Sequence, residues 1–337
     1  MNSNISDINN NLENILVIGD VFFVQNDIQK LINLVRNELK DFTVLANLEG
    51  SINFANNKSK KLMSLSLPMF DPNDMPQNLY FSVVNNHVTD YGIDNFLKNI
   101  KYLENKVVYS SNDKVVTYIN NKKFIFLADK KEQCVLRGTN FLSFSNSVLK
   151  KIAPNLKDSH VIVHGGIEYR KNPTLYQRSL ARKIIDNGAE SVIFHHSHVV
   201  GHFEYWKEKL IHYGLGNAFF SDTFNLHKLE ESISQGVIID GSLKILNLKV
   251  LSPVGIVDSS YENNSFKKKD YDYKQFYKNR YKLESSFRPR QLFLNDIFID
   301  TQFYLWSTVA NFFVKNKLSK PIKSFLNRFI KTNDHHE

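Results

Sequence analysis

The sequence holds little that would cross-link the chain or carry it across a membrane. One cysteine, Cys134, occurs in 337 residues. It excludes an internal disulfide and a metal site built from several thiolates, and it fits a reducing compartment. No run of about 18 apolar residues is present, so we expect no membrane-spanning helix. The first residues, MNSNISDINNNLEN, lack the basic and apolar segments of a signal peptide. These absences favour a cytoplasmic protein.

Charge is in excess on the positive side. The chain carries 43 Lys and Arg against 34 Asp and Glu, a net charge of +9. A basic protein of this size favours an anionic partner such as a phosphate, an acidic glycan, a nucleic acid or a membrane surface. Nucleic acid ranks lowest, because the basic residues concentrate outside the segments described next and lack the aromatic interleaving of a nucleic-acid groove.

Short apolar runs alternate with amphipathic segments along the first 250 residues. The runs have the length of buried strands, and the segments repeat apolar residues at helical spacing. This alternation is typical of an α/β fold whose site lies at the strand ends. The expected strands are residues 15–18, 43–46, 79–84, 107–108, 115–119, 123–127, 160–163, 191–194, 210–213, 236–239 and 243–250, and the expected helices are 27–40, 93–105, 145–153 and 173–187.

Turn residues predict two hairpins and one long loop. Asn120-Asn121 and Asp240-Gly241 each separate two apolar runs at hairpin spacing. Residues 53–78 hold Asn, Lys, Ser and three prolines, which favours an irregular loop over the site.

Five of the apolar runs end on residue types that bind divalent metals. These residues are Asp20, Glu49, Asn86 with His87, His164, and His196 with His198. Carboxylate, amide oxygen and imidazole suit one or two ions of manganese, iron or zinc, roughly 3.5–4 Å apart when two are bound. In such a site a carboxylate bridges the ions, and a nearby imidazole donates a proton to the leaving oxygen.

Each of these residues also has an ordinary structural explanation. An Asp or Asn after a strand is commonly a turn or cap residue, and Glu49 alone could be a surface carboxylate. His196 and His198 occupy alternate positions after a strand, which predicts that both point the same way. The joint pattern favours a metal or phosphate site, because six of the eleven histidines lie within residues 160–202 and each ligand type follows its own strand.

Six short motifs in order carry a resemblance to a known family. They are Gly19-Asp20, Asn47-Leu48-Glu49, Asn86-His87 with Asp90 and Gly92, His164-Gly165-Gly166 with Glu168-Tyr169, His195-His196-Ser197-His198, and Tyr213-Gly214-Leu215-Gly216-Asn217. The sequence resembles the bacterial capsule-synthesis CapA family, the poly-γ-glutamate capsule protein group within the calcineurin-like metallophosphoesterase fold. The resemblance spans residues 15 to about 250.

The resemblance implies a four-layer α-β-β-α sandwich with metal ions at the strand ends. The metal ligands that it implies are Asp20, Asn86, His164, His196 and His198, with Glu49 at the bridging position. His87 would be the general acid, and Asp90 would orient it. The residues expected to bind substrate are Glu168, Tyr169, Arg170, His195 and Asn217, and Arg170 is suited to a phosphate.

One position, as expected for CapA-type members, departs from the wider superfamily, and three depart from the family pattern. Phe22 stands where a histidine is usual in the wider superfamily, which leaves one metal position a ligand short and makes single-ion occupancy an alternative. Gly165 replaces an expected Trp, Phe194 an expected Gly, and Ser197 an expected Pro. These changes would reshape the pocket without removing a ligand.

The chain is expected to have four parts. They are a disordered N-terminus at residues 1–11, a CapA-like domain at 12–258, a polar basic linker or solvated helix at 259–291, and a basic amphipathic helical extension at 292–337. Two alternatives stand for the extension: helices packed on the main domain, or a surface that rests on an anionic membrane and makes the protein peripheral to its inner face.

The resemblance implies a metal-dependent phosphoesterase, a monoesterase or diesterase, in capsule or surface polysaccharide synthesis. Its substrate would be a phosphorylated sugar, polyol or glycan, and its partners would include other capsule biosynthesis proteins. One alternative is a phosphoryl or acyl transferase, or a subunit of a poly-γ-glutamate-type ligase. Another is a metal-bearing scaffold without catalytic activity.

Overall fold

The computed structural model describes residues 13–25, 27–54, 64–129, 139–168, 172–220, 233–240, 243–251 and 255–258. The chain divides into two units, Met1–Ser265 and Phe266–Glu337, and every described residue belongs to the first. The expected disordered N-terminus, the linker and the amphipathic extension lie outside the described residues. The division into four parts therefore stays a prediction.

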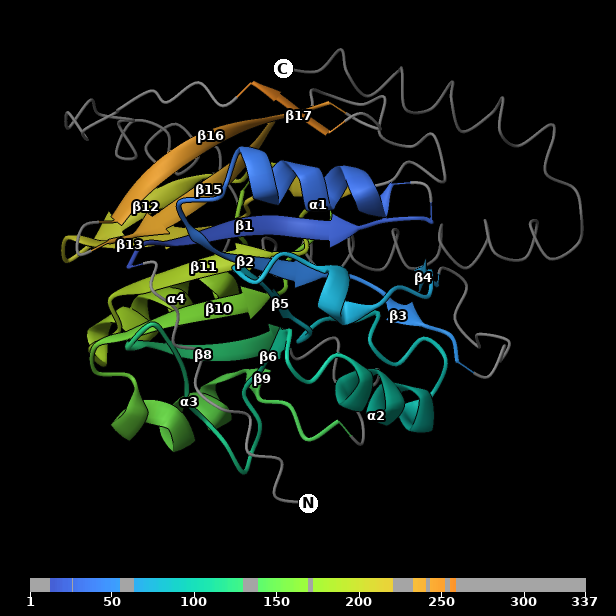
Figure 1. Cartoon of the computed structure of the whole chain (residues 1–337). Coiled ribbons are helices and arrows are strands. Elements are labelled where there is room, and N and C mark those ends of the chain that lie inside the picture. Colours follow the sequence, from blue (N-terminus) through green and yellow to red (C-terminus); the bar gives the residue numbers. More distant parts are fainter. Residues whose placement is uncertain are drawn as a thin grey trace, which may run out of the picture. The chain divides into compact units, whose positions relative to one another are not determined.

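The first sheet combines strands from the beginning and the end of the described chain. It consists of β1 (Ile15–Phe22), β2 (Thr43–Leu48), β5 (Leu79–Ser82), β6 (Val107–Val108), β14 (Asn217–Phe220), β15 (Ile233–Ile239), β16 (Leu243–Leu251) and β17 (Gly255–Asp258). The order is β17-β16-β15-β1-β2-β5-β6 (Figure 1). β14 also pairs with β1. β1, β2, β5, β6 and β14 are parallel, so their carboxyl ends meet at one edge.

The second sheet holds the strands from the middle of the chain. It consists of β7 (Thr117–Ile119), β8 (Lys122–Asp129), β9 (Ser143–Phe144), β10 (Ser159–His164), β11 (Ser191–His195), β12 (Phe203–Trp206) and β13 (Lys209–His212). The order is β12-β13-β11-β10-β8-β7, with β9 paired to β8. Neighbours among β8, β10, β11 and β13 are parallel, and β7 and β12 are antiparallel to theirs. Two short strands, β3 (Ser51–Ile52) and β4 (Ser66–Leu67), pair separately.

The second sheet is buried on both faces. Neighbouring residues of a strand point to opposite sides of a sheet, and on β8 both sets belong to a hydrophobic core. Phe124 and Phe126 of β8 join the core that contains the first sheet. Ile125 and Leu127 join a second core with α4 (Leu175–Asp186) and α3 (Asn146–Ile152). On the first sheet, α1 (Ile28–Asn37) contributes its apolar face to the first core. Two sheets flanked by helices confirm the expected α/β sandwich (Figure 1).

Local sequence signals set the ends of α4, which follows the candidate site residue His164. Thr174 and Gln177 form a reciprocal capping box at its start, and Gly188 follows its last turn with a φ of 101°. The Gln177 side chain also donates a hydrogen bond of 3.3 Å to the carbonyl of Gly165. The cap therefore fixes both the helix and the loop that leaves β10.

Both predicted hairpins are present. Asn120 and Asn121 have φ of 46° and 60° between β7 and β8, the backbone that a tight hairpin turn needs. β15 and β16 pair as antiparallel strands around residues 240–242. The expected loop at 53–78 is only partly irregular, because it includes β4 and a short 3₁₀ turn at Pro72–Asp74; residues 55–63 of it lie outside the described part.

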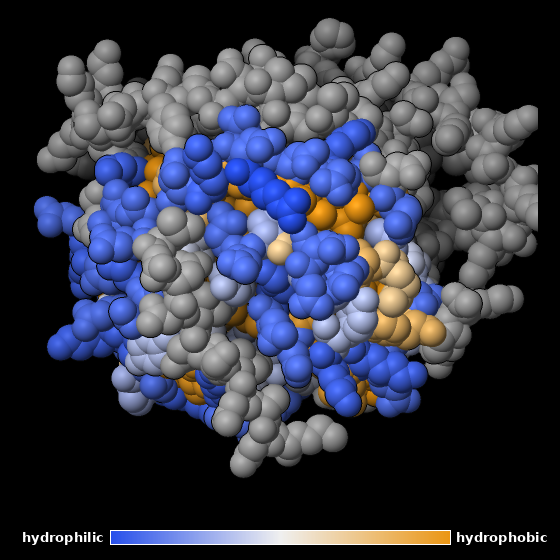
Figure 2. Space-filling model, viewed as in Figure 1, coloured by the Kyte–Doolittle hydropathy of each residue, from blue (hydrophilic) through white to orange (hydrophobic). Residues whose placement is uncertain are grey.

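The described surface on the face shown in Figure 2 is mostly hydrophilic, with hydrophobic residues showing in limited areas. Among the described helices, none combines the length and the apolar content that crossing a bilayer requires.

Candidate metal centre

The predicted metal-binding residues converge at the carboxyl ends of parallel strands. Asp20 lies near the end of β1, and Glu49 directly follows β2. Asn86 and His87 follow β5 in a turn. His164 is the last residue of β10, and the segment with His196 and His198 follows β11. Residues far apart in the sequence therefore meet because their strands end at the same place.

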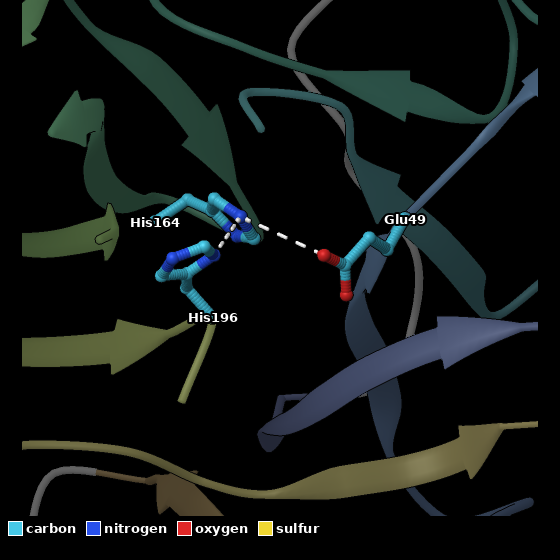
Figure 3. A group of neighbouring side chains, drawn as sticks. All are labelled: Glu49, His164 and His196. Carbon is cyan, nitrogen blue, oxygen red and sulfur yellow. Dashed lines mark hydrogen bonds and ion pairs between the residues drawn. The ribbon is translucent and has the colours of Figure 1, made fainter. Parts of the chain in front are cut away.

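One group of donor atoms surrounds His164. Its Nε2 lies 2.9 Å from Oδ1 of Asn86, 3.1 Å from Nδ1 of His196 and 3.9 Å from Oε1 of Glu49. Figure 3 shows the two imidazoles and the carboxylate turned toward one another. His164, His196 and Glu49 are all buried.

These separations fit a bound divalent ion. Metal bonds of about 2.1 Å in a tetrahedral site put the donor atoms about 3.4 Å apart, close to the 2.9–3.9 Å observed. Two imidazoles, an amide oxygen and a carboxylate are also a ligand set that zinc, iron and manganese accept. The residues present therefore fit a metal ion at this position.

A second group of donor atoms surrounds His198. Its Nδ1 lies 3.7 Å from Oδ2 of Asp20 and 3.7 Å from Oε2 of Glu49. Glu49 thus turns one carboxylate oxygen to each group. This is the arrangement that a bridging carboxylate requires.

The backbone conformation at His196 and His198 is not the extended one that the sequence analysis assumed. The strand β11 ends at His195, and the two histidines lie beyond it with φ of 87° and 57°, in the left-handed region that is costly for residues other than glycine. Both side chains face the donor groups, as expected, but strand alternation is not the reason. A turn aims these side chains, and the amide of His196 donates a 3.1 Å hydrogen bond to Oδ2 of Asp20.

Burial keeps the imidazoles of His164, His195 and His196 neutral. Burial lowers the pKa of His164 well below 6.5, and the neighbouring histidines lower it further. Burial, and then His198 and His87, lower the pKa of His196 to about 3. Burial likewise lowers the pKa of His195. A neutral imidazole is the form that ligates metal.

His87 and Asp90 form a pair beside the first donor group. Nδ1 of His87 donates to Oδ2 of Asp90 at 2.8 Å, and the same oxygen accepts the amide of Leu65 at 2.8 Å. Nε2 of His87 lies 3.9 Å from Oε1 of Glu49. The pair therefore orients a second imidazole nitrogen toward the centre.

Asn47 and Asn85 are site residues that sequence reasoning missed. Nδ2 of Asn47 donates to Oδ1 of Asp20 at 2.8 Å and lies 3.2 Å from Nδ1 of His164. Asn85 donates to Oδ1 of Asn47 at 3.2 Å and accepts the amide of His87 at 3.0 Å. The available signal was the position of Asn47, which shares a strand face with Glu49 two residues later.

The expected substrate-binding residues differ in where they lie. Nδ1 of His195 is 3.7 Å from Oδ1 of Asp20, and His195 is buried, which favours support of Asp20 over contact with a substrate. Oδ1 of Asn217 lies 2.9 Å from Nδ1 of His198. Glu168 is half-buried, and no described contact joins it to the donor groups. Tyr169 and Arg170 lie outside the described residues.

Comparisons with known proteins agree with the motifs. Residues 119–222 match the family model for the bacterial capsule synthesis protein PGA_cap. This span includes His164, His196 and His198, and it leaves out Asp20 and Glu49.

Two curated relatives are similar over parts of their length. The capsule biosynthesis protein CapA of Bacillus anthracis is 27% identical over 198 residues, covering 51% of this chain and 47% of that protein. The PGA biosynthesis protein CapA of Bacillus subtilis is 42% identical over 57 residues, covering 17% of this chain and 15% of that protein. The chain thus spans about half of the first relative and less of the second.

A solved structure, that of a hypothetical protein from Thermus thermophilus, is similar with a TM-score of 0.40 and 16% identity, covering 73% of this chain and 96% of that one. The matches to the family model and to the curated relatives support the resemblance that the six motifs carry. The chain is thus similar to the CapA family of bacterial capsule-synthesis proteins over these parts of its length.

Proposed function

We propose that this protein is a metal-dependent phosphoesterase that acts on a phosphorylated sugar, polyol or glycan during capsule synthesis. The observation that carries the proposal is the position of Glu49, which turns one oxygen to His164 at 3.9 Å and the other to His198 at 3.7 Å. His87 faces the first of these oxygens at 3.9 Å. A shared carboxylate next to an oriented imidazole suits phosphoester hydrolysis.

A bound divalent ion would supply a Lewis acid for a phosphoryl oxygen and lower the pKa of a water molecule. The residues that would hold it are Glu49, Asn86, His164 and His196, since their donor atoms already face one another. Manganese, iron and zinc all suit these donors.

His87 supplies the proton in this proposal. Asp90 holds the Nδ1 proton at 2.8 Å, which leaves Nε2 to donate its proton to the leaving oxygen of the ester. Because Asp90 also accepts the amide of Leu65, the imidazole has one preferred orientation. Asp90 is thus a positioning residue for His87.

The anionic substrate class rests on charge and on the family. The net charge of +9 favours a negatively charged partner of the chain as a whole, although most of the excess lies outside the segments that form the site. The similar Bacillus proteins carry the names capsule and PGA biosynthesis protein.

The test is hydrolysis of p-nitrophenyl phosphate and bis-p-nitrophenyl phosphate by the full chain with added Mn²⁺, before and after chelation. We expect turnover that chelation abolishes, and the preferred substrate separates a monoesterase from a diesterase. His196→Ala should remove the turnover, whereas His202→Ala, a histidine of the same segment outside both donor groups, should keep it. Turnover that survives both chelation and His196→Ala would contradict the proposal.

A ligase subunit is the second candidate, since the similar protein of Bacillus subtilis is named a PGA biosynthesis protein. A subunit of this kind would bind metal yet hydrolyse neither ester without its ATP-using partner. Metal binding without turnover would therefore favour it over the phosphoesterase.

A further inference from the structure

The two donor groups differ in the number of residues that contribute to them. The group at His164 has four contributing residues, whereas the group at His198 has Asp20, Glu49 and His198. Phe22, at the position where the wider superfamily usually has a further histidine, is buried, and its ring centroid lies 5.3 Å from that of Phe220. The second group therefore needs another donor if it is to hold an ion.

Asn217 is the candidate for that donor. Its Oδ1 is 2.9 Å from Nδ1 of His198, the same nitrogen that lies 3.7 Å from Asp20 and from Glu49. Three oxygens from three segments of the chain thus surround one imidazole nitrogen. A donor set of this composition suits a hard divalent cation.

The backbone holds Asn217 beside Asp20. The two residues are register partners in the parallel pairing of β1 with β14, and the amide of Asp20 donates to the carbonyl of Gly216 at 3.0 Å. A Cβ at Gly19 would lie 1.9 Å from that carbonyl oxygen, so this close approach requires glycine there. The pairing fixes Asn217 independently of any contact made by its side chain.

We propose that Asn217 supplies the fourth donor of a second, oxygen-rich cation site formed with Asp20, Glu49 and His198. The site takes a hard divalent cation, Mn²⁺ or Mg²⁺. The two positive charges of the ion would neutralise the negative charges of the buried carboxylates of Asp20 and Glu49. The first group, with two imidazoles, is the better site for Zn²⁺. The inference rests on the proposed function in one respect: both require that the carboxylate of Glu49 is shared by the two donor groups.

The experiment is a binding titration that needs no turnover. Full-length protein is stripped with chelator, loaded with one equivalent of Zn²⁺ and titrated with Mn²⁺, with free Mn²⁺ followed by electron paramagnetic resonance. We expect the wild type to bind one Mn²⁺ per chain. Asn217→Ala should weaken Mn²⁺ binding by roughly 10- to 100-fold, the loss expected for a metal-site partner, while Asn217→Asp, which keeps an oxygen donor, should retain it.

Asn86→Ala is the matched control, because it removes an asparagine from the other donor group. It should weaken the binding of Zn²⁺ more than that of Mn²⁺, the reverse of Asn217→Ala. Thermal unfolding of each stripped variant identifies any variant that fails to fold. If Asn217→Ala fails to fold, the Mn²⁺ affinity of Asn217→Asp tests the inference instead, and loss of that affinity overturns it. A wild type that takes up at most one ion in total, or an Asn217→Ala protein with wild-type Mn²⁺ affinity, overturns the inference.

A crystal structure with Mn²⁺ separates a ligand from a residue that only orients His198. Asn217 Oδ1 within about 2.2 Å of the second anomalous peak, a usual metal–oxygen bond, supports the inference. An Asn217 that hydrogen-bonds to His198 away from the ion overturns it. Neither result depends on ester hydrolysis, so failure of this inference and failure of the phosphoesterase proposal can be told apart.

Discussion

The two sheets bring different atoms to the candidate metal centre. The first sheet and the turns after its strands supply oxygen donors, namely Asp20, Glu49, Asn86 and Asn217. The second sheet and the turn after β11 supply nitrogen donors, namely His164, His196 and His198. Neither half alone has the mixed set that borderline metals prefer. The centre is therefore a property of how the sheets pack on each other.

Asn47 is one of the direct links between the two halves. It lies on β2 of the first sheet, donates to Asp20 of the same sheet and contacts His164 of the second. It is also buried. The side chain thus sets the distance between an oxygen donor and a nitrogen donor that lie 144 residues apart in the sequence.

The largest effect should follow from replacing the carboxylate shared by both groups. Glu49→Gln should lose bound metal and slow ester hydrolysis by about 10³-fold or more, since several kcal/mol of metal assistance disappear. Glu190→Gln, at a partly exposed residue that pairs with Lys209, is the control for activity and metal content. Full metal content in Glu49→Gln would contradict a shared carboxylate.

Replacing His87 should separate chemistry from metal binding. His87→Asn should lower turnover by roughly 10²- to 10⁴-fold, the usual contribution of a general acid, while metal content stays at the wild-type level. Asp90→Asn should have a smaller effect, because it loosens the orientation of the imidazole and leaves the proton donor in place. An unchanged pH profile in His87→Asn would rule out this role.

Breaking the link between the sheets should weaken metal binding without removing a ligand. Asn47→Ala should lower metal affinity by roughly 10- to 100-fold, as loss of a supporting hydrogen-bond partner does. Asn33→Ala, at an exposed asparagine of α1 that contacts Gln29, serves as the control. Equal metal affinities of the two variants by calorimetric titration would show that Asn47 does not position the donors.

The smallest effect concerns the opposite end of β10, away from the centre. Burial, and then Lys122 and Lys209, lower the pKa of His160 to about 4 from the usual 6.5. The unfolded chain therefore binds the proton first as the pH falls, and the stability of the fold decreases between pH 6.5 and 4. At pH 5 the loss from this residue is about 2 kcal/mol.

Urea unfolding at pH 7 and pH 5 measures this contribution. His160→Gln should lose less stability than the wild type over that interval, and His202→Gln should lose as much as the wild type. Equal losses in all three proteins would contradict the assignment.

The sequence predicted the strand ends because each is marked locally. Asp20, Glu49 and His164 all follow apolar runs, and parallel strands bring such ends together. The helix predicted at 173–187 is observed at Leu175–Asp186, because Thr174 and Gly188 mark its limits. The α/β class follows from these local signals, whereas the four-layer sandwich was implied by the family resemblance.

Contacts that depend on sheet packing could not be predicted in the same way. The link through Asn47 requires the distance between two sheets, which no local pattern encodes. The positive φ at His196 and His198 is stabilised by contacts with other segments, including the bond to Asp20 and the side chain of Ser197 against Gly214. A Cβ at Gly214 would lie 2.2 Å from Oγ of Ser197, so the turn depends on a glycine from another strand end.

The most direct test of a centre formed between two sheets is the metal content of three proteins. Wild type, Glu49→Gln and His164→Ala are stripped with chelator, reloaded with Mn²⁺ or Zn²⁺, desalted and measured by elemental analysis. We predict bound metal in the wild type and a loss in both variants, although one changes the first sheet and the other changes the second. A wild type that retains no metal, or a variant of either sheet that retains all of it, would contradict a centre built from both sheets.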